Sequence, residues 1–213
     1  MNVVYFGSRE IYGDFRTAVR SLLAHNPDAR VWTLTEDPDP FYDLPVNNIV
    51  WNWGEYFNGT NVCTKWKQFG PIRAAFSKVF PFHDRIVSID CDTIVLDDIS
   101  ELWTMDLHGC HVAMVREINM SNYLGRPYYN NGICVMDLKR IREEGLDDAM
   151  IQDLNTTFYR YVGQDVMQKH LKILDLDPAY NQSKFTQPVE QKKILHFADR
   201  NDWRQLPEVV AYR

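Results

Sequence analysis

The sequence lacks the features that mark several large classes of protein. Its 213 residues include four cysteines (Cys63, Cys91, Cys110 and Cys134), none in a Cys-x-x-Cys spacing, which argues against a zinc site and a disulfide framework and favours buried thiols. A net charge of −6 argues against a broad nucleic-acid-binding surface, so an anionic ligand would be bound locally, by a metal ion or a few arginines. No stretch approaches the roughly 18 apolar residues of a membrane span, and the chain does not open on a signal peptide. We therefore expect a cytoplasmic protein, or a segment of a longer one.

What is present is an ordinary globular composition, with 45% hydrophobic and 24% charged residues. An apolar segment at 2–6 is followed by helical spacing over 14–25 and a second apolar segment at 31–34, a β-α-β pattern that predicts a parallel sheet. Further strands are expected at 48–51, 111–115, 133–139, 172–174 and 193–196, and helices at 65–79, 99–103 and 141–160. The segment 65–79 contains Gly70-Pro71, which predicts a kink or two shorter pieces. Loops are expected at 52–64 and 119–128.

The most informative segment is an apolar run at 85–89 that leads directly into Asp90 and Asp92. The run is dense in β-branched residues, which is typical of a strand buried on both faces of a sheet. In open α/β sheets, ligands bind at the carboxyl ends of strands. Two carboxylates spaced by two residues in extended chain point the same way and repel, and a divalent cation such as Mg²⁺ or Mn²⁺ removes that repulsion. The alternative is that the two acids only end the strand and cap the next turn.

Several segments, in order along nearly the whole chain, resemble glycosyltransferase family 8. They are Ser-Ile-Asp-Cys-Asp-Thr-Ile-Val-Leu at 88–96, Asp-Ile-Ser-Glu-Leu-Trp at 98–103, Tyr-Asn-Asn-Gly at 129–132, Gly-Gln-Asp at 163–165, Asp-Pro-Ala-Tyr-Asn at 177–181 and the strand that ends at His196. The resemblance implies a single α/β domain of the GT-A (Rossmann-like) fold, with a central, mostly parallel sheet flanked by helices. It implies a retaining, UDP-sugar-dependent hexosyltransferase, with a nucleotide-binding half at 1–115 and a sugar and acceptor half at 116–213.

The resemblance also implies a metal site. Asp90, Asp92 and His196 would bind Mn²⁺ on the diphosphate of the UDP-sugar, with Mg²⁺ as the second candidate. A nitrogen ligand tilts the preference toward Mn²⁺.

Donor contacts follow from the same resemblance. The turn after the first strand (Phe6, Gly7 and Ser8, with Tyr12 as a stacking ring) would hold the nucleoside. Arg73, with Lys65 as a weaker candidate, would reach the donor sugar and its phosphates. The donor sugar would contact the segment Asn130, Asn131 and Gly132, where glycine lets the backbone approach a ligand.

For catalysis, Gln164 matches the family residue beneath the sugar, and Asp165 is the nearby carboxylate that a covalent route would need. An amide is a poor nucleophile, so attack by the acceptor on the same face is favoured over double displacement. Asp165 has a structural alternative as an acid in the first turn of a helix.

Two departures from the family pattern keep other functions open. Gly163 replaces an acid that would contact the sugar, and the terminal motif lacks a diphosphate-binding lysine, a role that Arg200 or Arg204 could take. A non-catalytic UDP-sugar or glycan-binding module therefore remains an alternative. A sugar-nucleotide nucleotidyltransferase is another, although Gly7-Ser8-Arg9 is too short for its glycine-rich loop.

Overall fold

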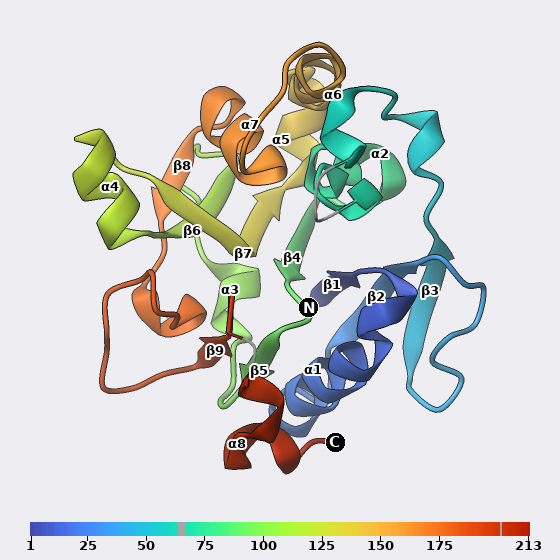
Figure 1. Cartoon of the computed structure of the whole chain (residues 1–213), viewed down its shortest axis with the longest axis vertical. Helices are drawn as coiled ribbons and strands as arrows, with labels where there is room; N and C mark the ends of the chain where they lie inside the picture. Colours follow the sequence, from blue (N-terminus) through green and yellow to red (C-terminus); the bar gives the residue numbers. More distant parts are fainter. Residues whose placement is uncertain (64–66, 201) are drawn as a thin grey trace.

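The computed structural model describes residues 1–63, 67–200 and 202–213. It forms a seven-stranded sheet covered by helices on both faces, with a separate two-stranded ribbon (Figure 1). The strands are β1 (Asn2–Phe6), β2 (Arg30–Thr35), β3 (Val46–Val50), β4 (Arg85–Ile89), β5 (Thr93–Val95), β6 (Val112–Arg116), β7 (Tyr129–Asp137), β8 (Ile173–Asp175) and β9 (Ile194–His196). The α-helices are α1 (Tyr12–His25), α2 (Phe76–Val79), α3 (Glu101–Thr104), α4 (Ile118–Leu124), α5 (Leu138–Glu143), α6 (Leu146–Thr156), α7 (Val162–His170) and α8 (Pro207–Val210).

The order of the main sheet is β3-β2-β1-β4-β7-β6-β8, and β7 alone runs against the others. The prediction of a mostly parallel α/β sheet flanked by helices is therefore confirmed. The reversed strand matters for the site, because it brings the amino end of β7 beside the carboxyl ends of β4 and β6. Ile89 pairs with Ile133, and the backbone N–H of Asp90 donates to the carbonyl of Gly132 at 2.8 Å.

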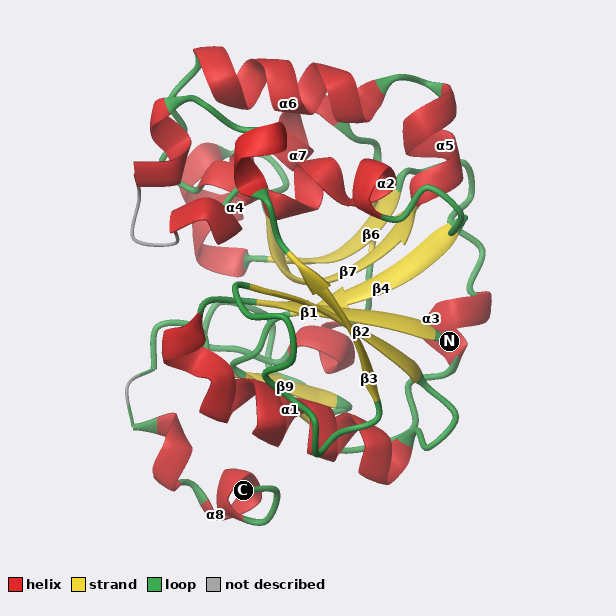
Figure 2. Cartoon of the chain, turned by 90° about the vertical axis from the view of Figure 1, so that its right-hand side faces the viewer, coloured by secondary structure: helices red, strands yellow, loops and turns green. Residues whose placement is uncertain are grey.

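The two faces of the sheet have separate cores, as the two-residue period of a strand requires. Val4 and Phe6 of β1 pack into the core under α2 and α5–α7, whereas Val3 and Tyr5 pack into the core against α1. Figure 2 shows the sheet between these two layers, with α2, α4, α5, α6 and α7 on one side and α1 and α3 on the other. Apolar residues on both faces explain why these strands read as continuous hydrophobic runs.

The ribbon of β5 and β9 lies below the main sheet, next to α8 (Figure 1). In its antiparallel register Thr93 pairs with His196, and the N–H of Phe197 donates to the carbonyl of Asp92 at 2.9 Å. Phe197 stacks on Trp203, and both belong to a small apolar cluster under the C-terminal segment. Backbone pairing thus places the end of β9 alongside the turn that follows β4.

Three sequence-based expectations require correction. The expected loop at 119–128 contains α4, a helix that ends at Gly125, whose φ of 64° is the left-handed conformation that glycine adopts readily. The expected long helix at 141–160 is two helices, α5 and α6, separated at Gly145 with φ 66°. The loop expected at 52–64 contains the 3₁₀ turns Trp53–Glu55 and Thr60–Cys63.

The helix expected at 65–79 is short pieces in its described part: the 3₁₀ turns Lys67–Phe69 and Ile72–Ala75, then α2. The break falls at Gly70-Pro71, as the proline predicts. Lys65 lies outside the described residues.

Within the described part of the chain, no helix is both long and apolar enough to cross a membrane. Cys91 and Cys134 are buried free thiols.

Candidate active site

Three side chains that could bind a metal ion meet where β4 and β9 end. Asp90 and Asp92 lie in the turn between β4 and β5, and His196 is the last residue of β9. His196 Nε2 lies 3.4 Å from Asp92 Oδ1 and 3.7 Å from Asp90 Oδ2, and the three candidate ligand atoms lie within 4.8 Å of one another. Between the acids, Cys91 is buried and its thiol points to the carbonyl of Phe6 at 3.1 Å. One oxygen from each acid and one imidazole nitrogen form a donor set suited to Mn²⁺ or Mg²⁺.

Groups of opposite charge face each other in this cluster. His196 is 5% exposed, while the two carboxylates are about one-third exposed at the cavity. Burial opposes ionisation of both partners, but the Asp92 carboxylate raises the pKa of His196, and the imidazolium in turn lowers the pKa of Asp92. A divalent cation would replace the imidazolium proton as the positive partner of the two acids.

Arg73 is a buried part of the same cluster. It is 4% exposed, and its guanidinium donates to Ser88 Oγ at 3.2 Å and to Asp90 Oδ1 at 2.7 Å. The guanidinium also lies over the ring of Phe6, 4.6 Å from the centroid. Although burial lowers it, the pKa of Arg73 is raised by Asp90. The arginine expected to touch the donor is therefore fixed mainly as the partner of an expected metal ligand.

The expected sugar contacts on β7 differ in how their amides are used. Asn130 is 6% exposed: its Oδ1 accepts from the N–H of Gly132 at 2.9 Å, and its Nδ2 donates to Glu117 at 2.8 Å. The side chain of Asn131 makes no hydrogen bond within the described part of the chain and lines the cavity beside Gly163. Of the two, Asn131 has the amide that is available to a sugar hydroxyl.

Gln164, in the first turn of α7, is oriented from both ends of its amide. The N–H of Asn131 donates to Gln164 Oε1 at 3.3 Å, and Gln164 Nε2 donates to Glu117 Oε1 at 3.3 Å. Gly163 packs against the backbone of the distant residue Gly70, and a Cβ at 163 would lie 2.6 Å from the carbonyl oxygen of Gly70. A side chain is excluded at this position, which gives a packing reason for the missing acid.

Asp165 is engaged elsewhere. Its Oδ1 accepts from Tyr128 Oη at 2.6 Å and its Oδ2 accepts from the N–H of Tyr161 at 2.9 Å. Burial and this carboxylate raise the pKa of Tyr128 well above its usual range. Asp165 is not among the residues that line the cavity, and both of its carboxylate oxygens accept hydrogen bonds at the start of α7.

The carboxyl end of β1 contributes one wall residue to the cavity, Phe6. Gly7 is required by packing, since a Cβ there would lie 2.4 Å from the side chain of Ile11. Ser8 begins a 3₁₀ turn, and the ring of Tyr12 packs edge-on against Phe41. Neither Ser8 nor Tyr12 lines the cavity.

One cavity of about 410 Å³ collects most of the expected site residues. It is lined by Phe6, Phe69, Gly70, Arg73, Asp90, Asp92, Glu117, Asn119, Met120, Asn130, Asn131, Tyr161, Val162, Gly163, Gln164, Phe185, His196, Ala198 and Asp199. Gly132 lies just behind it, against the ring of His196.

Sequence reasoning missed two residues that hold the site together, Glu117 and Asn181. Glu117 follows β6 directly, and its position at the carboxyl end of a predicted strand could have drawn attention to it. Asn181 ends the segment Asp-Pro-Ala-Tyr-Asn at 177–181, which resembles the family pattern but does not by itself indicate a role for this asparagine.

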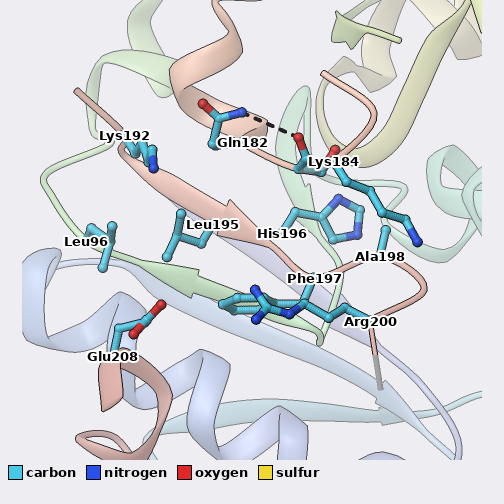
Figure 3. A pocket seen from close by; sticks show the side chains of 11 residues that line it. Leu96, Gln182, Lys184, Lys192, Leu195, His196, Phe197, Ala198, Arg200 and Glu208 are labelled. Atoms are coloured by element: carbon cyan, nitrogen blue, oxygen red, sulfur yellow. Dashed lines mark hydrogen bonds between the residues drawn. The ribbon is translucent and has the colours of Figure 1, made fainter. Parts of the chain in front are cut away.

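A second cavity of about 450 Å³ lies against the outer face of β9 and shares His196 and Ala198 with the first. Figure 3 shows Lys184, Lys192, Arg200 and Glu208 around Leu195 at its floor.

The arginines considered as a substitute for the family's lysine are both paired. Arg200 contacts Asp202 at 2.9 Å, and Arg204 makes a two-pronged contact with Asp14.

Comparisons with known sequences agree on one family. Residues 65–201, more than half of the chain, match the model of glycosyl transferase family 8. General stress protein A of Bacillus subtilis is 32% identical over 78 residues, which is 33% of this chain and 27% of that protein. Lipopolysaccharide 1,2-glucosyltransferase of Escherichia coli is 29% identical over 126 residues, covering 49% of this chain and 36% of that protein. The chain thus matches about a third or less of the length of these two relatives.

Solved structures agree on the fold. The apo structure of the bifunctional glycosyltransferase WbbM superposes on the whole chain with a TM-score of 0.79 at 16% identity, over 49% of the WbbM chain. The galactosyltransferase LgtC, solved with donor and acceptor sugar analogues, also covers the whole chain, with a TM-score of 0.74 at 14% identity over 95% of its length. With the GT-A architecture and the family match in agreement, the chain belongs to glycosyltransferase family 8.

Proposed function

We propose that this chain is a metal-dependent retaining hexosyltransferase that moves a hexose from a UDP-sugar to a hydroxyl of a glycan or other acceptor. The observation that carries the proposal is the convergence of Asp90, Asp92 and His196 in the lining of a cavity whose walls also carry amide side chains. Carboxylates and imidazole suit a cation on a diphosphate, and amides suit sugar hydroxyls.

In this proposal the two halves of the chain divide the work. The half at 1–115 supplies Phe6, Arg73, Asp90 and Asp92 for the nucleotide and its phosphates. The half at 116–213 supplies Asn131 and Gln164 for the sugar, and His196 returns from the end of the chain to the metal cluster. A bound Mn²⁺ or Mg²⁺ supplies Lewis-acid stabilisation of the negative charge on the leaving diphosphate.

Retention without a covalent intermediate fits the residues available. Gln164 is an amide and therefore a poor nucleophile. Both oxygens of Asp165 already accept hydrogen bonds, and Asp165 does not line the cavity. We infer same-face attack by the acceptor hydroxyl, with the leaving phosphate taking its proton. Gln164, held by Asn131 and Glu117, would orient the sugar in this step.

The donor is proposed to be UDP-glucose or another UDP-hexose. One relative bears the name of a glucosyltransferase and one solved neighbour that of a galactosyltransferase, which supports a hexose without choosing between the two.

The test is UDP release from UDP-glucose and UDP-galactose, with and without Mn²⁺, in the absence and presence of simple glycoside acceptors. Asp92→Ala should reduce metal-dependent turnover at least about 1,000-fold, because it removes a first ligand of the cation. The matched control is Asp84→Ala, which removes an exposed acid and should leave turnover within about twofold.

Three outcomes would count against the proposal. Full turnover by Asp92→Ala refutes the metal assignment, and an inverted anomeric configuration of the product, read by NMR, refutes retention. Binding of UDP-sugar with no release of UDP in any condition favours the non-catalytic module.

A further inference from the structure

Behind the metal cluster, four buried side chains form one continuous line of hydrogen bonds. His196 Nδ1 contacts Asn181 Oδ1 at 2.8 Å, Asn181 Nδ2 donates to Asn130 Oδ1 at 2.9 Å, and Asn130 Nδ2 donates to Glu117 Oε1 at 2.8 Å. Asn181 is fully buried and the other three are between 5% and 8% exposed. The four residues come from β9, the 3₁₀ turn Pro178–Asn181, β7 and the residue before α4, so the line joins four separate parts of the chain.

The direction of this line is fixed independently at one end. An ionised carboxylate can only accept, so Asn130 turns its NH₂ group toward Glu117. A backbone N–H can only donate, and that of Gly132 points at the other atom of the same amide, Oδ1, at 2.9 Å. Both constraints give the same orientation of Asn130.

The orientation of Asn130 determines the rest of the line. Since Asn130 Oδ1 is an acceptor, Asn181 must present its NH₂ to it and its carbonyl to His196. A carbonyl accepts only, so the proton on that side of the ring is carried by Nδ1. When the ring is neutral, Nε2 therefore has the free lone pair, and Nε2 is the atom that faces Asp90 and Asp92.

The backbone of β7 packs directly against the same ring. A Cβ on Gly132 would lie 2.2 Å from His196 Cε1 and 2.5 Å from His196 Nδ1. These distances are too short for any real Cβ, so residue 132 must be glycine for the imidazole to lie where it does. The glycine of the Tyr-Asn-Asn-Gly segment therefore makes room for a side chain of the protein, where the sequence suggested room for a ligand.

We propose that Asn181, Asn130 and Glu117 are positioning residues that hold His196 in the Nδ1–H tautomer, with Nε2 directed at the metal. This inference rests on the metal site of the proposed function. Partners of this kind behind a metal-binding histidine typically change metal affinity 10- to 100-fold when removed. Glu117 Oε1 also accepts from Gln164, so one carboxylate oxygen anchors both the metal side and the sugar side of the cavity.

We call the line of hydrogen bonds from His196 through Asn181 and Asn130 to Glu117 the relay. The first experiment needs no metal and no substitution in the relay. In the metal-free protein with ¹⁵N-labelled histidine, at alkaline pH where the ring is neutral, long-range ¹H–¹⁵N spectra report which ring nitrogen carries the proton. The His196 signal is identified by its loss in His196→Gln. The expected result is a protonated Nδ1 and a bare Nε2, and a proton on Nε2 with a bare Nδ1 overturns the relay.

The second experiment measures Mn²⁺ affinity from the electron paramagnetic resonance of free Mn²⁺, without nucleotide. Asn181→Leu, which has no acceptor for the Nδ1 proton, should weaken binding 10- to 100-fold. The matched control is Asn47→Leu, the same substitution at an exposed asparagine that lines neither cavity, and it should leave affinity within about threefold. Melting temperatures identify a variant that is merely unfolded.

The two proposals fail in different ways. If the wild type binds no Mn²⁺ but its Nδ1 is protonated, the proposed function fails and the relay stands. If the wild type binds Mn²⁺ and folded Asn181→Leu binds it equally well, the relay is refuted and the metal site stands.

Discussion

The two cavities that share His196 are lined by different kinds of residue. The one that opens onto Asp90 and Asp92 is backed by buried polar side chains, each held by partners from other elements. The one against the outer face of β9 has an apolar floor and a rim of exposed charges (Figure 3). The first arrangement spends folding free energy to orient groups that water could have solvated, because burying a polar group is unfavourable unless it is hydrogen-bonded. The second needs no such ordering.

This contrast shows that buried polar side chains held in fixed orientations, rather than charge alone, distinguish a candidate site from a cavity with charged residues at its rim. The cavity with the fewer lysines is the one that we assign to an anionic donor. Its positive charge comes from one buried arginine and a cation that the chain itself would bind.

The largest effect on stability is expected from Arg73→Met, which roughly keeps the volume of the side chain and removes its charge. Asp90 then loses its buried partner, and the hydrogen bond to Ser88 is lost. Loss of a partner to a charged group, discounted because Asp90 is partly exposed, should cost about 2–3 kcal/mol of unfolding free energy. Turnover should fall at least about 100-fold, and urea unfolding and the UDP-release assay measure the two effects. Wild-type stability of this variant would contradict the ion pair.

A pair of glycine-to-alanine substitutions tests how closely the backbone packs against the His196 ring, because each adds a single methyl group. Gly132→Ala places a methyl group against the His196 ring and should destabilise the protein by about 2 kcal/mol, with weaker Mn²⁺ binding. Gly13→Ala, on α1 with no atom within 4 Å of the added Cβ, should instead stabilise by about 0.5–1 kcal/mol. Thermal and urea melts compare the two, and equal effects would contradict the close packing at residue 132.

Much of this arrangement was predictable from sequence, since local patterns define strands. The β-branched run at 85–89 indicated a buried strand, and the strand-end rule placed Asp90 and Asp92 at its tip. Gly70-Pro71 correctly predicted a break in the helical segment expected at 65–79. The break at Gly145 was missed, because an isolated glycine can either end a helix or be tolerated within it. At Gly125 the error was the opposite one: the polar segment was expected to be a loop, and the helix α4 that ends before this glycine was missed.

The partners of His196 could not be predicted, because they depend on pairing between distant segments. Residue 196 reaches Asp92 through the β5–β9 ribbon, and β5 has only three residues, too few to reveal a separate strand. Likewise, the sequence suggested that Asn130 contacts sugar, while the fold engages its amide with Glu117 and Asn181. A family pattern identifies which residues matter more readily than it identifies what each one touches.

A half-buried polar cluster outside both cavities provides the next comparison. Asp153 on α6 accepts from His170 and Lys169 at 2.7 Å each and from Tyr159. Burial opposes its ionisation, but these partners together lower the pKa of Asp153 well below its usual value. The stabilisation is therefore present above the unfolded pKa of about 3.9 and is lost as pH falls toward the lower folded pKa.

We expect Asp153→Asn to cost about 1 kcal/mol at pH 7, and this difference should shrink steadily below pH 4. Turnover should be unchanged, since the cluster does not line either cavity. Urea unfolding across pH 3–7 gives the first quantity and the UDP-release assay the second. A constant difference at all pH values would show that the stabilisation does not depend on the charge of Asp153.

The smallest effect is expected at the charged rim of the second cavity. Both lysines, Lys184 and Lys192, are exposed. Lys184 donates to the backbone carbonyl of Asp199 and lies over the ring of Phe185. Neither side chain is held in a fixed direction by a buried partner, and salt screens the interactions of exposed charges. The double variant Lys184→Ala and Lys192→Ala should therefore leave the KM for the UDP-sugar and kcat within about twofold. A rise of tenfold or more in the KM for an acidic acceptor, with the donor KM unchanged, would contradict the comparison, because the rim would then recognise the acceptor without burial or fixed orientation.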